Sequence, residues 1–230
     1  MIRLDFRFSF GISLVFMLCI AVGILPAQSF TIDQWLETVP GADQYEDVAD
    51  DLRSIYDRAA DSAGADELVQ RFLREAAVKR VPPDNIVAVF DGYVDRLITA
   101  QRAVEQAGDA PSVREDAATL ESAIVFLQTN AGGETLSRLL GYAQSARHAR
   151  EVFLTLTQIS GIDALSDETL LDLGRAMLES ALSADSYSAL ASLYSEGRAR
   201  QRPESQVVSA IVNALDDGGG LIQIRQALRR

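Results

Sequence analysis

Apolar side chains recur at three- and four-residue steps along most of the chain, most clearly on either side of Val81-Pro82-Pro83-Asp84. Before the prolines the apolar positions are Leu68, Val69, Phe72, Leu73, Ala76 and Ala77, and after them Ile86, Phe90, Tyr93, Leu97, Ala100 and Val104. This spacing places each set on one side of a helix. Proline disfavours helical backbone at the preceding residue and suits a first helical turn. We therefore predict an α-hairpin over Glu67 to Arg102, with one helix ending near Lys79 and the next beginning at Pro83.

The same periodicity predicts further helices, whose ends are marked by capping residues, glycine and proline. Capping-box spacing marks Thr31 to Gln34 and Ser112 to Glu115, and later starts are marked by Ser166, Asp185 and Pro203. The expected helices cover residues 31–39, 48–59, 67–79, 83–106, 112–127, 134–160, 166–181, 185–194, 203–215 and 221–228, which gives nine or ten. Within the long segment 134–160, Gly141 is expected to cause a bend.

Strand signals are nearly absent, since no long run alternates apolar and polar residues and no Asn-Gly or Asp-Gly turn joins two such runs. The predicted fold is all-α, with about nine helices built from short-turn α-hairpins in a single domain over residues 30–230. A break near 108–111 is a candidate sub-boundary. Glu75 to Ile86 aligns loosely with Glu196 to Val207, and more weakly with Thr157 to Leu170. Because no fixed period emerges, a helical-repeat array and an irregular bundle both stay open.

The amino terminus has the pattern of a secretory signal peptide over residues 1–29. Arg3 and Arg7 precede an uncharged apolar stretch, 8–27, and Ala27-Gln28-Ser29 offers small residues at a cleavage site. This stretch of 20 residues would also span a bilayer if left uncut, so a membrane anchor is the alternative. We expect a periplasmic or secreted bacterial protein or, if the segment is retained, one anchored in the inner membrane with its domain outside the cytoplasm.

Composition narrows the available chemistry. Cys19 is the only cysteine, and it lacks the small preceding residues of a lipidation site, so the cleaved chain would hold no disulfide, thiolate nucleophile or Cys-ligated metal. The formal charge of −12 argues against binding to a nucleic-acid backbone. Lys79 is the only lysine, which removes most Schiff-base and Ser-Lys chemistry.

Two short stretches resemble known families. Lys79 to Ile86 is similar to the Lys-Gly-Val-Pro-Pro-x-x-Ile turn of uncharacterised exported bacterial α-helical proteins, with Arg80 in place of the usual glycine. A second copy, Glu196-Gly197-Arg198-Ala199, keeps a glycine, and its proline follows at Pro203. This resemblance covers about a quarter of the chain, and it implies an exported helical protein without implying an activity.

Gly220 to Ile224 resembles the Gly-Leu-Met-Gln-Ile element of lytic transglycosylases, which cleave peptidoglycan, and Glu204-Ser205 lies sixteen residues before Gly220, close to the family's catalytic spacing. The resemblance would make Glu204 a general acid, which needs a raised pKa in a partly dry cleft. However, the chain ends ten residues after Gly220, whereas that family needs further helices to close its cleft. Pro203-Glu204 is also explained as a helix start.

The remaining candidates have simple structural interpretations. His148 is the only histidine, so no His-Glu-x-x-His metal site exists and the serines have no evident general base. The carboxylates at 43–51 and at 163–172 lack the order of a calcium loop and suit a solvated helix face and a helix start. Tyr187 and Tyr194 share a helix face, either in the core or, if exposed, in a partner groove.

We therefore predict an exported, non-catalytic helical interaction or scaffold protein of the bacterial cell envelope. No catalytic, cofactor-binding or metal-ligating residue is predicted. The expected partner is another envelope protein, with no nucleic acid and with membrane contact only if 8–27 is retained. The alternatives are a cell-wall-active enzyme that uses Glu204 and a membrane-anchored subunit of an envelope complex.

Overall fold

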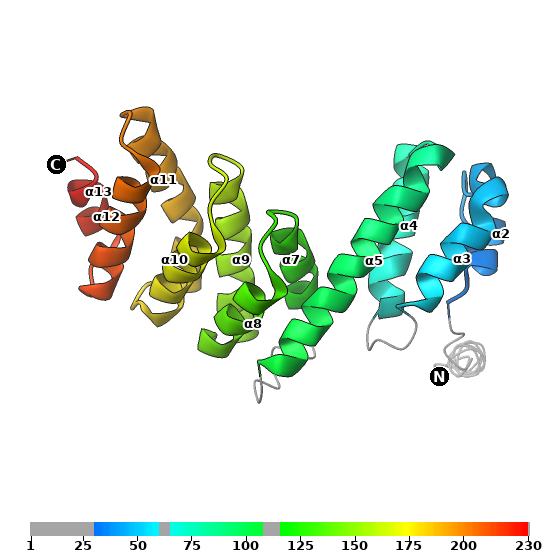
Figure 1. Ribbon diagram of the computed structural model, residues 1–230, viewed down its shortest axis with the longest axis horizontal. Coiled ribbons are helices and arrows are strands. Elements are labelled where there is room, and N and C mark those ends of the chain that lie inside the picture. The colour runs from blue at the N-terminus through cyan, green and yellow to red at the C-terminus, as the bar shows by residue number, and fades with distance from the viewer. Residues whose placement is uncertain (1–29, 60–64, 108–115, 230) are drawn as a thin grey trace, which may run out of the picture.

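The computed structural model describes residues 30–59, 65–107 and 116–229 (Figure 1). These ranges hold eleven α-helices, two short 3-10 helices and no strand, so the all-α prediction is confirmed while the count of about nine is too low. The signal peptide 1–29, its apolar stretch 8–27 with Cys19, and the candidate boundary at 108–111 lie outside the described residues. No described helix is both long enough and apolar enough to cross a membrane.

The helices are named by their order in Figure 1. The α-helices are α2 (Ile32–Thr38), α3 (Ala49–Asp57), α4 (Ala65–Lys79), α5 (Pro83–Gln106), α7 (Ala117–Leu127), α8 (Gly133–Tyr142), α9 (Ala146–Ser160), α10 (Asp167–Glu179), α11 (Ser188–Ala199), α12 (Glu204–Asp216) and α13 (Leu221–Ala227). The 3-10 helices are η1 (Asp43–Val48) and η2 (Ala184–Ser186).

From α5 onward the helices form an extended two-layer array rather than an irregular bundle (Figure 1). In one layer α7 packs against α9 and α9 against α11. In the other, α5 packs against α8, α8 against α10 and α10 against α12. Successive hairpins therefore each place one helix in each layer, which is the arrangement of helical-repeat proteins. At the amino-terminal end, α3 and η1 pack on α5.

The core between the layers is apolar and closely packed. Phe126 of α7 stacks on Phe153 of α9, with ring centroids 5.4 Å apart. Gly174 of α10 lets Leu139 and Leu156 approach closely, since a Cβ there would lie 2.6 Å from a Leu139 methyl carbon. In the amino-terminal group Trp35 stacks on Tyr45 at 5.4 Å.

The α4–α5 hairpin has the predicted ends, Lys79 and Pro83. Its turn is a Schellman motif: the Val81 N–H donates to the Ala76 carbonyl and the Arg80 N–H to the Ala77 carbonyl. Arg80 has φ of 51°, in the left-handed region that glycine adopts most readily. The Tyr45 hydroxyl, from η1, donates to the Val81 carbonyl at 2.8 Å and so ties the turn to the amino-terminal group.

The left-handed residue of this turn recurs in two later turns, and one of the two differs in position from what the sequence suggested. Gln201 between α11 and α12 and Asn130 between α7 and α8 also have positive φ, 61° and 65°. Gln201, rather than Gly197, therefore occupies the position that corresponds to Arg80. Gly197 lies buried inside α11, where a Cβ would come within 3.0 Å of Val207.

Three predicted helix boundaries are wrong or not covered. The segment 134–160 is two helices, α8 and α9. Ser145 caps the second by accepting a hydrogen bond from the His148 N–H. Gly141, the expected point of a bend, lies within α8. Asp185 caps no helix, since it lies in η2 and pairs with Arg147. The capping box at 112–115 is outside the described residues, and the described start of α7 is capped by Asp116. The predicted caps Thr31 and Ser166 are confirmed.

Candidate binding site

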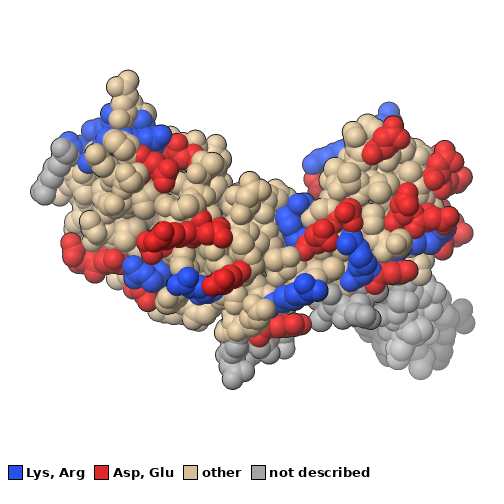
Figure 2. Space-filling model, viewed as in Figure 1, with Lys and Arg blue, Asp and Glu red and all other residues tan. Residues whose placement is uncertain are grey.

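The first layer of the array is interrupted between α4 and α7. From α7 onward its helices pack directly side by side, whereas α4 makes no comparable contact with α7. In Figures 1 and 2 the upper edge of the molecule dips over α7, between α5 and α9. A hollow of about 330 Å³, here called the trough, lies between α4, α5 and α7.

Three helices line the trough, each with one strip of side chains at helical spacing. The strip on α4 runs from Leu68 to Lys79, that on α5 from Ile86 to Arg96, and that on α7 from Glu121 to Gln128. The α4 strip spans twelve residues, a helical rise of about 16 Å. The hollow is therefore elongated along the helices and lies at the small end of the 300–1,000 Å³ range typical of ligand sites.

Aromatic and aliphatic side chains form the walls and floor. Phe72 stacks on Tyr93 at 4.5 Å and on Phe90 at 5.6 Å. The Tyr93 hydroxyl donates to the Leu68 carbonyl at 3.3 Å, and burial raises the pKa of Tyr93 to about 12. Tyr93 is therefore neutral at physiological pH and acts as part of the wall. Val89 remains 48% exposed at one side of the trough.

Charged side chains are arranged around this apolar lining. Arg71 of α4 donates to Glu121 of α7 at 2.6 Å and to Glu67 at 3.1 Å, and the nearby Glu121 carboxylate raises the pKa of Arg71. Both Arg71 and Glu121 are about half exposed, so their ion pair crosses the opening of the trough rather than its floor. At the other end Lys79 pairs with Glu75.

Unlike Arg71 and Lys79, Arg96 has no ion-pair partner among the described residues. It lines the trough from α5, yet it forms no hydrogen bond or ion pair with the described residues, and its Nε is buried without an acceptor. Buried donors are nearly always satisfied in folded proteins, so an orphaned guanidinium nitrogen is informative. Nothing in the sequence pattern singled out Arg96, because an arginine on a helix usually has a solvated head group.

The residues that resemble a transglycosylase site are not brought together. Glu204 is half-buried at the first residue of α12, while Gly220 follows the carboxyl end of that helix. The two ends of this 13-residue helix are about 20 Å apart. A shallow hollow beside Gly219 and Gln223 contains no carboxylate except Asp217.

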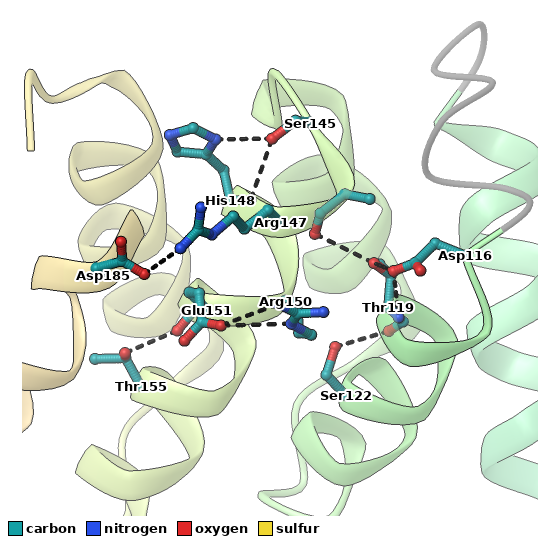
Figure 3. Close-up of polar contacts among 11 residues, drawn as sticks. Asp116, Thr119, Ser122, Ser145, Arg147, His148, Arg150, Glu151, Thr155 and Asp185 are labelled. Carbon is teal, nitrogen blue, oxygen red and sulfur yellow. Dashed lines mark hydrogen bonds and ion pairs between the residues drawn. The ribbon is translucent and has the colours of Figure 1, made fainter. Parts of the chain in front are cut away.

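A serine does meet the single histidine, contrary to the sequence argument that the serines lack a base. Ser145 Oγ lies 2.8 Å from His148 Nδ1 (Figure 3). The same oxygen accepts the His148 N–H at 3.3 Å, so the pair is an N-cap of α9. Around it, Arg147 pairs with Asp185, and the buried Thr119 hydroxyl lies 3.2 Å from the Ala146 carbonyl, joining α7 to α9. These contacts hold helix ends together.

The carboxylate clusters also have structural roles. In the first cluster Asp47, Asp50 and Asp51 are exposed opposite buried apolar positions, as predicted. In the second, Asp163 accepts hydrogen bonds from Arg198 at 2.5 Å and from Tyr194 at 2.7 Å. The Arg198 bond and then the Tyr194 bond lower the pKa of Asp163. Among the described residues no group of three or more His, Cys, Asp or Glu side chains could hold a metal ion.

Tyr187 and Tyr194 are fully buried, so the core position is confirmed and the alternative of an exposed partner groove is excluded. The Tyr187 hydroxyl donates to the Met177 carbonyl at 2.9 Å, and the Tyr194 hydroxyl to Asp163. Both side chains therefore belong to the core between hairpins.

Comparisons of the whole chain with protein-family models, with curated proteins and with solved structures give no match.

Proposed function

We propose that this chain is an exported, non-catalytic helical interaction protein of the bacterial cell envelope, and that the trough is its binding site. The observation that carries this proposal is the interrupted contact between α4 and α7. Elsewhere in the first layer the apolar face of one helix is covered by the next, but here Phe72, Tyr93 and Val89 border a hollow. A concave apolar site with a few polar groups is the usual form of a binding site.

The arrangement of the other candidates supports a non-catalytic role. Glu204 and Gly220 lie at opposite ends of α12, and Ser145 and His148 meet as a helix cap. A general acid or a nucleophile needs its partners within hydrogen-bond reach of a substrate. Neither pair offers such an arrangement beside the trough.

Export is proposed from residues 1–29, with cleavage before about Phe30 and a second envelope protein as the expected partner. Retention of 8–27 would instead make the chain a membrane-anchored subunit. Amino-terminal sequencing of the protein recovered from envelope fractions distinguishes the two. A soluble species that begins near Phe30 supports export with cleavage, and an intact terminus in the membrane fraction contradicts it.

Site-specific photo-crosslinking tests the binding role. A photoreactive phenylalanine replaces Val89 in the trough or, as the control, Ile222, which is 71% exposed on α13. The full chain is expressed in a bacterium, irradiated and measured by intact mass. We expect a defined adduct at position 89 and none at position 222. No adduct at 89, or equal adducts at both positions, would contradict the proposal.

A further inference from the structure

The trough contains one cation that no carboxylate among the described residues neutralises. Its ionisable lining comprises three cations, Arg71, Lys79 and Arg96, and two carboxylates, Glu75 and Glu121. Arg71 pairs with Glu121 and Lys79 with Glu75. Arg96 is left without a carboxylate partner in this lining. The lining itself therefore has one more cation than carboxylates, with Glu67 outside it as a second partner of Arg71, in a chain whose formal charge is −12. An anion at Arg96 would supply the acceptor that its guanidinium lacks.

From these features we infer that the trough binds a single-chain fatty carboxylate. The carboxylate would pair with Arg96, and the apolar chain would lie along Phe72 and Ile124 toward Val89. Arginine–carboxylate pairs are strong because both partners are charged and two parallel hydrogen bonds can form. The inference rests on the proposed function, since it takes the trough as the binding site and names a small amphiphile, rather than a segment of a partner protein, as its occupant.

The position of Arg96 suits an amphiphile with its head group at one end. On α5 the lining positions run from Ile86 through Tyr93 to Arg96, so Arg96 ends that strip. The Tyr93 hydroxyl bonds to Leu68, which places Leu68 and the neighbouring Arg71 at the same end. The lining of α4 extends away from this end for about 16 Å. Along it Phe72 and Ala76 are the apolar positions, and the Lys79–Glu75 ion pair lies at the far end. A hollow of about 330 Å³ with this length is narrow, and its width suits a single acyl chain.

Bulkier occupants fit less well. A helix is about 10 Å across, and the Arg71–Glu121 ion pair bridges the opening through which it would enter. An extended peptide would need partners for its backbone N–H and C=O groups, and α4, α5 and α7 bond their backbone groups within their own helices. An acyl chain carries no polar group between its head and its tail, so it needs no such partners.

Calorimetric titration of the full chain with laurate, below its micelle concentration, tests the inference. We expect one saturable site. Arg96→Gln should weaken binding by about 10- to 100-fold, the usual worth of a hydrogen bond to a charged group. Arg74→Gln is the matched control, because Arg74 is exposed on α4 outside the trough and makes no ion pair with the described residues. Val89→Trp, which places a large side chain at the trough, should also block binding.

Four further results have defined meanings. Dodecyltrimethylammonium, with the same chain and a cationic head, should bind far more weakly than laurate, and equal binding would overturn the role of Arg96. Equal laurate affinity for the Arg96→Gln and Arg74→Gln variants, both folded by circular dichroism, would overturn it as well. Tighter binding of acetylated trileucine than of laurate would replace the fatty carboxylate by a peptide carboxyl terminus. A crosslink at position 89 without laurate binding leaves the proposed function standing and overturns this inference.

Discussion

Three hairpin turns of the array place a residue other than glycine in the left-handed region, namely Arg80, Asn130 and Gln201. A β-carbon makes this conformation costly by about 1–2 kcal/mol, and asparagine tolerates it best. The exported proteins that the Lys79 to Ile86 stretch resembles usually have glycine where this chain has Arg80. The backbone geometry gives a physical reason for that glycine.

Arg80→Gly should stabilise the protein. Glycine removes the steric cost of a φ of 51°. Part of that gain is lost because glycine has a larger conformational entropy in the unfolded chain. We expect a net increase of about 0.5–1 kcal/mol in the free energy of unfolding. Urea denaturation measures it. Arg74→Gly, the same change inside α4, should instead cost about 1 kcal/mol. A loss of stability in both variants would contradict the assigned turn geometry.

Some residue-scale features could be predicted from the sequence and others could not. Thr31 and Ser166 were found as caps because each precedes a clear apolar period. The cap at Ser145 cannot be predicted from the sequence, because the apolar positions Tyr142 and Ala146 keep helical spacing on either side of residues 143–145. The helix ends at Tyr142 even so, because Ala143 is extended and the Ser145 hydroxyl caps the next helix.

At the scale of elements, Asp163 joins the α9–α10 connection to α11 through Arg198 and Tyr194. These hydrogen bonds lower the pKa of Asp163 below its ordinary value. A carboxyl whose pKa is lower in the folded than in the unfolded state stabilises the fold above the unfolded pKa, which is about 3.9. That contribution is lost as the pH falls through the folded pKa.

Asp163→Asn should therefore lower stability at pH 7 and have a smaller effect below pH 4, where the wild-type carboxyl also begins to lose its charge. Urea midpoints of both proteins at pH 7 and at pH 3 measure the difference. Asp172→Asn is the control, because Asp172 is exposed on α10 and forms no hydrogen bond or ion pair with the described residues. If the Asp163 variant differs from wild type equally at both pH values, the assigned ion pair does not stabilise the fold.

The helices themselves followed from periodicity, whereas the trough did not. Phe72, Ile86, Tyr93 and Ile124 belong to ordinary apolar stripes in the sequence, and a stripe does not record whether a neighbouring helix or a ligand covers it. The separation of α4 from α7 depends on how three helices pack across the array. Arg96 was overlooked for the same reason, since its lack of a partner is visible only in the folded chain.

At the scale of the whole molecule, α5 links the amino-terminal group of helices to the regular array of hairpins that begins at α7. It has 24 residues, or about 36 Å, and it packs on α3 and η1 as well as on α7 and α8. Beyond α7 each hairpin contacts its neighbours, as expected for a repeat array, one of the two arrangements that the sequence left open. The trough lies where this regular stacking begins, so ligand binding is expected to stabilise α4, α5 and α7 relative to the distant α12 and α13.

Hydrogen–deuterium exchange of the full chain, with and without saturating laurate, tests this account most directly. A ligand that binds only the folded protein stabilises the segments it contacts. We predict slower exchange over residues 68–79, 86–96 and 121–128 and unchanged exchange in α12 and α13. Exchange that is unaltered throughout, or slowed first at α12 and α13, would show that the trough is not the binding site.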